Sequence, residues 1–134
     1  MMNNTSNSND SYPFEFASLY NLISQHRTFK KDIDDLLANK KLNGLNILDF
    51  GCGTGKHLDL LLEKKVKANL LAGYDPSNGF TKLNYKNKQF DFYNNLKNIP
   101  DLFDIILSWG EPINFVEKEN LKETLLSLLS LTNK

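Results

Sequence analysis

Apolar and polar residues follow two alternating patterns from residue 46 onward. Short apolar runs bounded by glycine, proline or polar residues are typical of strands, and they occur at 46–50, 70–74, 89–93 and 103–109. Between and after these runs, apolar residues recur at helical spacing over 55–67 and 117–131. In the second helix the spacing puts its leucines on one stripe, at Leu121, Leu125, Leu128 and Leu129. The patterns therefore predict strands that alternate with helices.

The part of the chain before residue 46 is different. Residues 1–11 are polar and show no periodicity, so we expect a disordered tail that precedes one domain at 12–134. Residues 14–40 carry apolar positions at helical spacing, which predicts two helices with a break near 26–28. Asn43-Gly44 is a turn signal directly before the first strand.

The alternation predicts the fold class. Strands separated by helices pair in parallel through right-handed crossovers, so we expect an α/β, doubly wound, Rossmann-like sheet. The run at 103–109 is apolar at most positions, which predicts a strand buried on both faces. Ligands of such sheets bind beyond the carboxyl ends of the strands, at the point where the strand order reverses.

Composition and charge narrow the function classes. The 134 residues fit one domain, and their 16 basic and 16 acidic residues cancel, which argues against a broad nucleic-acid-binding surface. Cys52 is the single cysteine, so an internal disulfide cannot form. No apolar run reaches the roughly 20 residues of a membrane helix, and the N-terminus lacks the pattern of a secretory signal. We therefore expect a soluble, cytoplasmic protein without a membrane partner.

The sequence Asp49-Phe50-Gly51-Cys52-Gly53-Thr54-Gly55 follows the first predicted strand and precedes a helix. A phosphate-binding P-loop would need glycine in place of Phe50 and a hydroxyl residue in place of His57. A dinucleotide fingerprint would need a third glycine at Lys56. The remaining pattern is an acidic residue followed by glycine at alternate positions.

This pattern resembles motif I of the class I S-adenosylmethionine-dependent methyltransferases. Glycine allows backbone angles that other residues avoid and lets a ligand approach the main chain. The helix that follows begins with free backbone donors. The resemblance implies that the turn binds the methionyl part of S-adenosylmethionine through Asp49, Gly51, Cys52, Gly53, Thr54 and Gly55.

A second match lies at the end of the second predicted strand. The resemblance implies that Asp75, followed by Pro76 and Ser77, holds the two ribose hydroxyls of the cofactor. A carboxylate suits this task because its oxygens only accept hydrogen bonds. Nicotinamide-binding folds place an acidic residue at nearly the same position, so Asp75 indicates a ribose site without choosing the cofactor. Aspartate is also a favoured helix N-cap, which is compatible with this role.

Weaker matches complete the predicted site. The resemblance implies that Asn95 and Leu96 contact the adenine, that Ser108 and Trp109 lie near the transferable methyl group, and that Tyr20 lies over the cofactor. Asn95 stands where many family members have aspartate. His26 and His57 lack metal-ligand spacing, and we expect a structural role for His57 and no metal site. Cys52 is interpreted as a small turn residue, and no catalytic residue is assigned.

The resemblance covers residues 14–131 but only the front of the family's seven-stranded fold, so we expect an incomplete fold. The chain ends after the helix that follows the fourth strand, and the fifth strand and the final antiparallel pair are expected to be absent. Without a fifth strand, residues 103–109 would form an unpaired apolar edge. Such edges favour pairing with another chain, so we expect a homo-oligomer or a partner chain at this edge.

Three functions remain open. The first is an S-adenosylmethionine-dependent methyltransferase that transfers a methyl group to a small-molecule acceptor. The second is a catalytically incomplete module that binds S-adenosylmethionine or S-adenosylhomocysteine and needs a partner to complete its fold. The third, a nicotinamide-binding domain, is disfavoured by the glycine spacing.

Overall fold

The structure is a computed structural model that describes residues 29–77, 79–80, 89–109 and 116–133. The predicted tail at 1–11, the helix expected before residue 28, and the residues Tyr20 and His26 lie outside the described residues. The helix predicted next is confirmed as α2, Phe29–Asn39.

The core of the fold is a parallel sheet with the strand order β3-β2-β1-β4. Its strands are β1 (Asn46–Phe50), β2 (Leu70–Tyr74), β3 (Asp91–Tyr93) and β4 (Ile105–Leu107). Because β1 lies between β2 and β4, the strand order reverses beside β1. The predicted α/β class with a doubly wound parallel sheet is confirmed.

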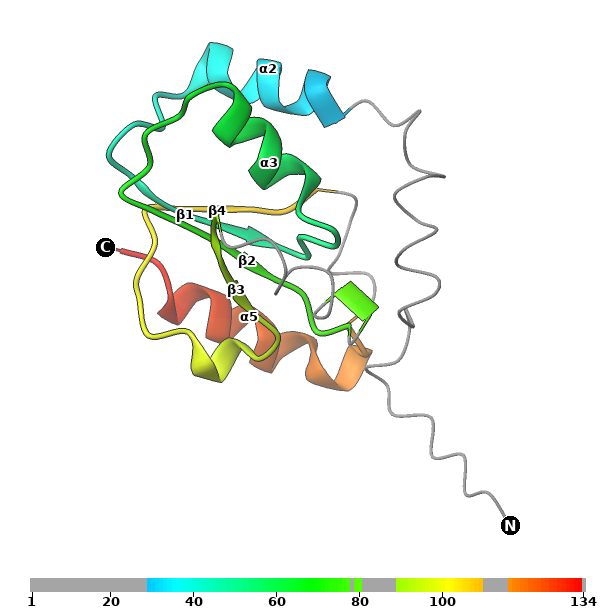
Figure 1. Ribbon diagram of the computed structural model, residues 1–134. Helices are drawn as coiled ribbons and strands as arrows, with labels where there is room; N and C mark the ends of the chain where they lie inside the picture. The colour runs from blue at the N-terminus through cyan, green and yellow to red at the C-terminus, as the bar shows by residue number, and fades with distance from the viewer. Residues whose placement is uncertain (1–28, 78, 81–88, 110–115, 134) are drawn as a thin grey trace.

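Helices cover both faces of the sheet (Figure 1). The helices α2 and α3 (Lys56–Glu63) lie on one face, and α5 (Leu121–Ser130) lies on the other. A core cluster lies between the sheet and the helices α2 and α3, and it is formed by Ile33, Leu42, Ile47, Leu61 and Leu107. A second core cluster lies on the α5 face of the sheet, and it is formed by Leu48, Ala72, Ile99, Phe103 and Leu131.

β1 is the central strand, and four of its five residues are buried. Successive side chains of a strand point to opposite faces. Ile47 accordingly packs with the cluster on the α2 and α3 face, and Leu48 packs with the cluster on the α5 face. In β4, Leu107 belongs to the first cluster and Ile106 packs against the second, which confirms that this strand contributes to both faces.

Three elements are shorter than predicted. The helix expected over 55–67 ends at Glu63, where Lys65 adopts a left-handed φ of 58°. β3 lacks the first two residues of the predicted run, and β4 lacks the first and last two. A short 3-10 helix, η2 (Leu96–Asn98), lies between β3 and β4, where the pattern predicts neither a helix nor a strand.

α5 packs less tightly than its leucine stripe predicts. The expected helix over 117–131 divides into a 3-10 helix, η4 (Lys118–Asn120), and α5. No residue of α5 is buried, and the side chains of Leu125, Leu126 and Leu129 are exposed. Helical spacing fixes which leucines share a face, whereas their burial depends on what the rest of the chain places against that face.

The side of residues 103–109 that faces away from β1 is partly paired. Phe103 forms a parallel bridge with Thr132, just after α5. The Phe103 amide donates to the Leu131 carbonyl at 2.7 Å, and the Asn133 amide donates to the Phe103 carbonyl at 2.8 Å. The expectation of an unpaired edge over residues 103–109 is therefore wrong at Phe103. Among the described residues, β4 itself pairs only with β1.

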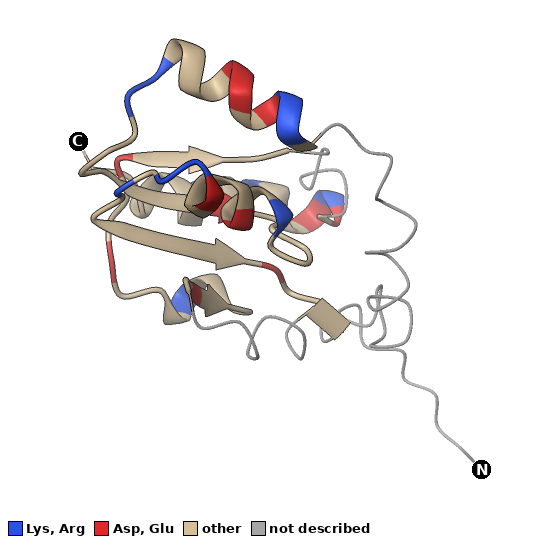
Figure 2. Cartoon of the chain, turned by 45° about the horizontal axis from the view of Figure 1, so that its top comes forward, with Lys and Arg blue, Asp and Glu red and all other residues tan. Residues whose placement is uncertain are grey.

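Charged residues of both signs occupy the helices, whereas the strands are largely uncharged (Figure 2). α2, for example, carries Lys31 beside Asp35, and Asp34 pairs with Lys64 after α3 at 2.6 Å. Within the described part of the chain, none of the helices has the length and apolar character needed to cross a membrane.

Candidate cofactor site

The glycine turn joins the carboxyl end of β1 to α3 at the switch point of the sheet. Gly51, Gly53 and Gly55 have positive φ angles of 79°, 54° and 79°, in the region that favours glycine. The amides of Gly51 and Cys52 both donate to the Tyr74 carbonyl, at 2.8 and 2.9 Å. The turn is thereby fixed to the end of β2, and Gly55 is the N-cap of α3.

Asp75 joins the end of β2 to the glycine turn. One carboxylate oxygen accepts from the Gly53 amide at 3.0 Å, and the other accepts from the Ser77 amide at 2.9 Å. Only 7% of Asp75 is exposed. Burial raises the pKa of this carboxyl above its ordinary value of 3.8, and the hydrogen bonds from Ser77 and Gly53 oppose that shift. Asp75 and Gly53 are therefore in direct contact, although they are 22 residues apart.

Gly73, which the sequence analysis did not single out, allows α3 to pack close to β2. A Cβ atom at Gly73 would lie 2.7 Å from Cys52 Sγ and 2.9 Å from Leu58 Cδ1, distances that no real Cβ tolerates. The Cys52 side chain fills this space, and burial raises the pKa of its thiol well above the ordinary value. Cys52 is thus a packing residue of the turn, in line with its interpretation from the sequence.

The other turn residues lie close by. Asp49 lies in the middle of the sheet, next to Gly73 of β2 and Leu107 of β4, and only 1% of it is exposed. Thr54 is half-buried. A cavity of about 40 Å³ adjoins the turn and is lined by Phe29, Gly51, Cys52, Gly53, Thr54, Lys56, His57 and Trp109. The structure therefore brings Trp109, at the end of β4, to the glycine turn.

The remaining predicted residues do not line this cavity. Ser108 is exposed and lines a different hollow, between β4 and α2. Pro76 is exposed beside Asp75. Asn95 follows β3, and its side-chain oxygen accepts from the Lys97 amide at 3.0 Å, which caps η2. Leu96 packs against the core on the α5 face.

Two aromatic residues at the turn were not predicted. Phe29 of α2 lines the cavity, and Phe80, of which 3% is exposed, lies 3.9 Å from the position of a Cβ atom on Gly53. Both are separated from the turn by many residues in sequence, so no local pattern indicated them.

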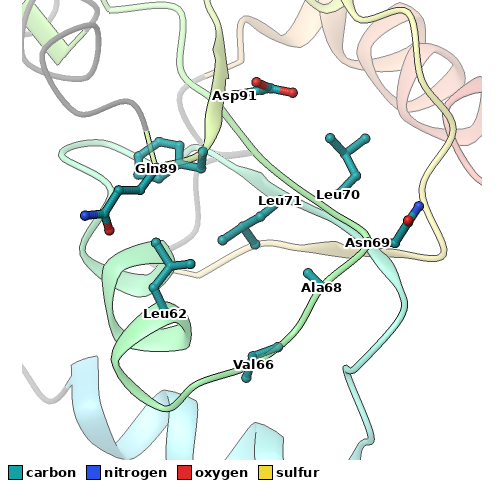
Figure 3. Close-up of a pocket in the computed structure, with 9 residues that line it drawn as sticks. Leu62, Val66, Ala68, Asn69, Leu70, Leu71, Gln89 and Asp91 are labelled. Atoms are coloured by element: carbon teal, nitrogen blue, oxygen red, sulfur yellow. The ribbon is translucent and has the colours of Figure 1, made fainter.

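A second hollow lies at the opposite end of the sheet (Figure 3). It has a volume of about 290 Å³ and lies between Leu62 of α3 and the amino ends of β2 and β3, at Leu70 and Asp91. Ligands of parallel sheets bind at the carboxyl ends of strands, so this hollow is not the cofactor site. Among the described residues, no group of three or more histidine, cysteine, aspartate or glutamate side chains could hold a metal ion.

A glycine turn at the switch point and an acidic residue after the next strand define a class of α/β domains that bind nucleoside-containing cofactors. A family model described as a methyltransferase domain matches residues 22–117, and this chain belongs to that family. The comparison with curated protein sequences finds no match.

Solved structures of methyltransferases share the fold. The magnesium protoporphyrin IX methyltransferase of Synechocystis PCC 6803, solved with bound S-adenosylmethionine, is 20% identical with a TM-score of 0.61, over 94% of this chain and 63% of its own. An amino pentose methyltransferase of Micromonospora echinaspora is 16% identical with a TM-score of 0.64, over 91% and 53%. A sugar N-methyltransferase of Streptoalloteichus is 15% identical with a TM-score of 0.65, over 99% and 55%. The chain thus spans less than two thirds of these neighbours.

Proposed function

We propose that this chain binds S-adenosylmethionine at the glycine turn and forms the cofactor-binding part of a methyltransferase acting on a small molecule. The observation that carries the proposal is the turn itself, held open by three glycines with positive φ and joined to Asp75 by the Gly53 amide. Membership of the methyltransferase family supports the same cofactor.

The residues present fit this cofactor chemically. A carboxylate has about four acceptor positions, and Asp75 uses two of them for the Gly53 and Ser77 amides. The remaining capacity suits the ribose hydroxyls. The cavity of about 40 Å³ admits only a small group, so most of the cofactor would lie across the turn and the carboxyl ends of the strands.

The chain would contribute mainly binding and orientation. When bound, S-adenosylmethionine supplies a methyl group that its sulfonium charge already activates. The glycine turn would hold the methionyl part, Asn95 would accept from the adenine, and Ser108 and Trp109 would flank the methyl group. Alignment of an acceptor with that group is itself a large part of catalysis. No side chain is assigned as a general base, and an amine acceptor would not require one.

A small acceptor and a cytoplasmic location complete the proposal. Acidic and basic residues intermingle on the described helices, which favours a small molecule over a polyanion such as nucleic acid (Figure 2). The single buried cysteine is compatible with the reducing cytoplasm.

The cofactor is tested by calorimetry of the purified chain against S-adenosylmethionine, S-adenosylhomocysteine and NAD. We expect micromolar binding of the first two and none of NAD, because the glycine spacing departs from the dinucleotide fingerprint. Micromolar binding of NAD without binding of S-adenosylhomocysteine would contradict the proposal. Turnover of labelled cofactor with a panel of small molecules then tests catalysis.

We also propose that another strand, from a second copy of this chain or from a partner, pairs with the open side of β4. Backbone groups at a sheet edge favour strand addition, and β4 pairs only with β1 among the described residues. The parallel bridge between Phe103 and Thr132, just before β4, supports parallel pairing on this side of the sheet. A module that needs such a partner for activity is the alternative to a methyltransferase that acts alone.

Light scattering at tens of micromolar is expected to show a dimer or a larger species. The exposed leucines of α5 could also cause association, so the double variant Leu126→Lys, Leu129→Lys serves as the control. Association that persists in this variant supports pairing at β4, whereas its loss assigns association to α5. A stable monomer in which β4 is protected from hydrogen exchange would contradict the proposal.

A further inference from the structure

His57, Asp32 and Trp109 form a cluster that links α2, α3 and the segment after β4. His57 Nε2 lies 2.9 Å from Asp32 Oδ2. The His57 ring stacks on the Trp109 indole, with ring centroids 4.0 Å apart and planes inclined by 19°. Phe29 also lies against the His57 ring, with centroids 4.9 Å apart and planes inclined by 71°. His57 is 5% exposed, so its imidazole is held on several sides at once.

The contact with Asp32 fixes the orientation of the imidazole ring. A carboxylate only accepts hydrogen bonds, so Nε2 carries the hydrogen in this contact. The Asp32 side chain is 31% exposed, whereas that of His57 is 7% exposed. Asp32 of α2, which is partly exposed, therefore orients the buried ring of His57 in the first turn of α3.

Trp109 stands between two spaces. Its side chain lines the cavity of about 40 Å³ at the glycine turn. It also lines an open hollow of about 440 Å³ between α2 and β4. The orientation of the indole therefore sets the boundary of the cofactor cavity on the β4 side. Trp109 also packs against the core cluster on the α2 and α3 face, and its stack on the buried His57 ring is the contact made by its aromatic plane.

We propose that His57 is a positioning residue of the cofactor site: anchored by Asp32, it holds the Trp109 indole against the glycine turn. This inference rests on the proposed function, and it assigns His57 a role beyond packing. Without the stack, Trp109 would keep its contacts with the core cluster but lose the contact that orients its indole plane, so a bound cofactor would meet a less preorganised wall.

Trp109 is the only tryptophan of the chain, so tryptophan emission reports the surroundings of this one side chain, the His57 stack included. S-adenosylhomocysteine is titrated into the wild type and the variants His57→Ala and Asp32→Ala, and both calorimetric affinity and tryptophan emission are recorded. We expect Asp32→Ala to weaken binding by about threefold to tenfold, the range of one hydrogen bond. His57→Ala is expected to weaken it by at least about tenfold, because the stack is lost too. Both variants should alter the Trp109 emission.

Asp34→Ala is the matched control, because Asp34 lies on the same helix and also pairs with a residue at the end of α3, Lys64. We expect its affinity within about twofold of the wild type and an unchanged emission. If His57→Ala fails to fold, Asp32→Ala decides the matter. A folded Asp32→Ala variant with wild-type affinity and emission would overturn the role of His57 but leave the proposed function intact. A wild-type chain that binds no S-adenosylhomocysteine would overturn the proposed function as well.

Discussion

Gly53→Val is expected to abolish binding of S-adenosylhomocysteine while the chain remains folded. Gly53 has a φ of 54°, which a β-branched residue adopts only under strain. Among the described residues, a Cβ atom at this position would have Phe80 as its one neighbour within 4 Å, at 3.9 Å, which is ordinary van der Waals contact. The valine side chain would instead occupy the approach to the turn. We expect affinity to fall by at least about 100-fold, the sum of lost contacts and about 1–3 kcal/mol of strain.

Gly44→Val is the matched control, because it introduces the same kind of backbone strain at a residue outside the proposed cofactor site. Gly44 has a φ of 80°, and no described residue would lie within 4 Å of a Cβ atom there. It lies in the turn before β1, at the end of the sheet opposite to the glycine turn. Calorimetry and thermal unfolding should show similar losses of stability for both variants but a loss of affinity only for Gly53→Val. Unchanged affinity in a folded Gly53→Val chain would show that the glycine turn has only a structural role.

Asp75→Ala is expected to weaken cofactor binding by about 1.5–3 kcal/mol, the range for hydrogen bonds to a charged group. The variant removes the proposed acceptor of the ribose hydroxyls. It also removes the bond that holds the Gly53 amide, at 3.0 Å. Asn is expected to substitute poorly, because two backbone amides face the two oxygens and the side-chain amide would oppose one of them. Calorimetry with S-adenosylhomocysteine measures both variants.

The control for Asp75 is Asp91→Ala, an exposed aspartate at the amino end of β3. An affinity of Asp75→Ala within about twofold of the wild type, about 0.4 kcal/mol, would remove the ribose role.

The pH dependence of cofactor binding gives a second test of Asp75. Hydroxyl donors favour the ionised carboxylate, and burial raises the pKa of Asp75 above 3.8. Affinity should therefore fall as pH decreases towards this raised pKa, and the fall should be absent in Asp75→Ala.

The same raised pKa affects stability in the opposite direction. A folded state that binds a proton more tightly than the unfolded state is stabilised at low pH. The contribution of Asp75 is therefore fully present below its ordinary pKa of 3.8 and is lost as pH rises through the raised pKa. Cofactor binding thus favours the ionised carboxylate of Asp75, whereas folding favours its protonated form. Shifted pKa values of this kind are common at functional sites.

The sequence alone predicted the bounds of β1 and β2, at 46–50 and 70–74. Both are inner strands of the described sheet, and each contributes apolar side chains to the cores on both faces. It also predicted the place of the glycine turn and of Asp75, because both are defined by residues at strand ends. β3 and β4 lie at the edges of the described sheet, where the same kind of apolar run left the strand ends undecided.

What the sequence determined is therefore local: the period of apolar residues, the glycines that need positive φ, and the acidic residue after the second strand. The tertiary structure decided which distant groups meet. It placed Asp32 beside His57, Trp109 on the same ring, and Phe103 against the segment after α5. It left every leucine of α5 at least partly exposed, and it placed Cys52 and Leu58 where they would collide with a Cβ atom on Gly73. These contacts join residues far apart in the chain, and only the packing of helices on the sheet brings such residues within contact distance.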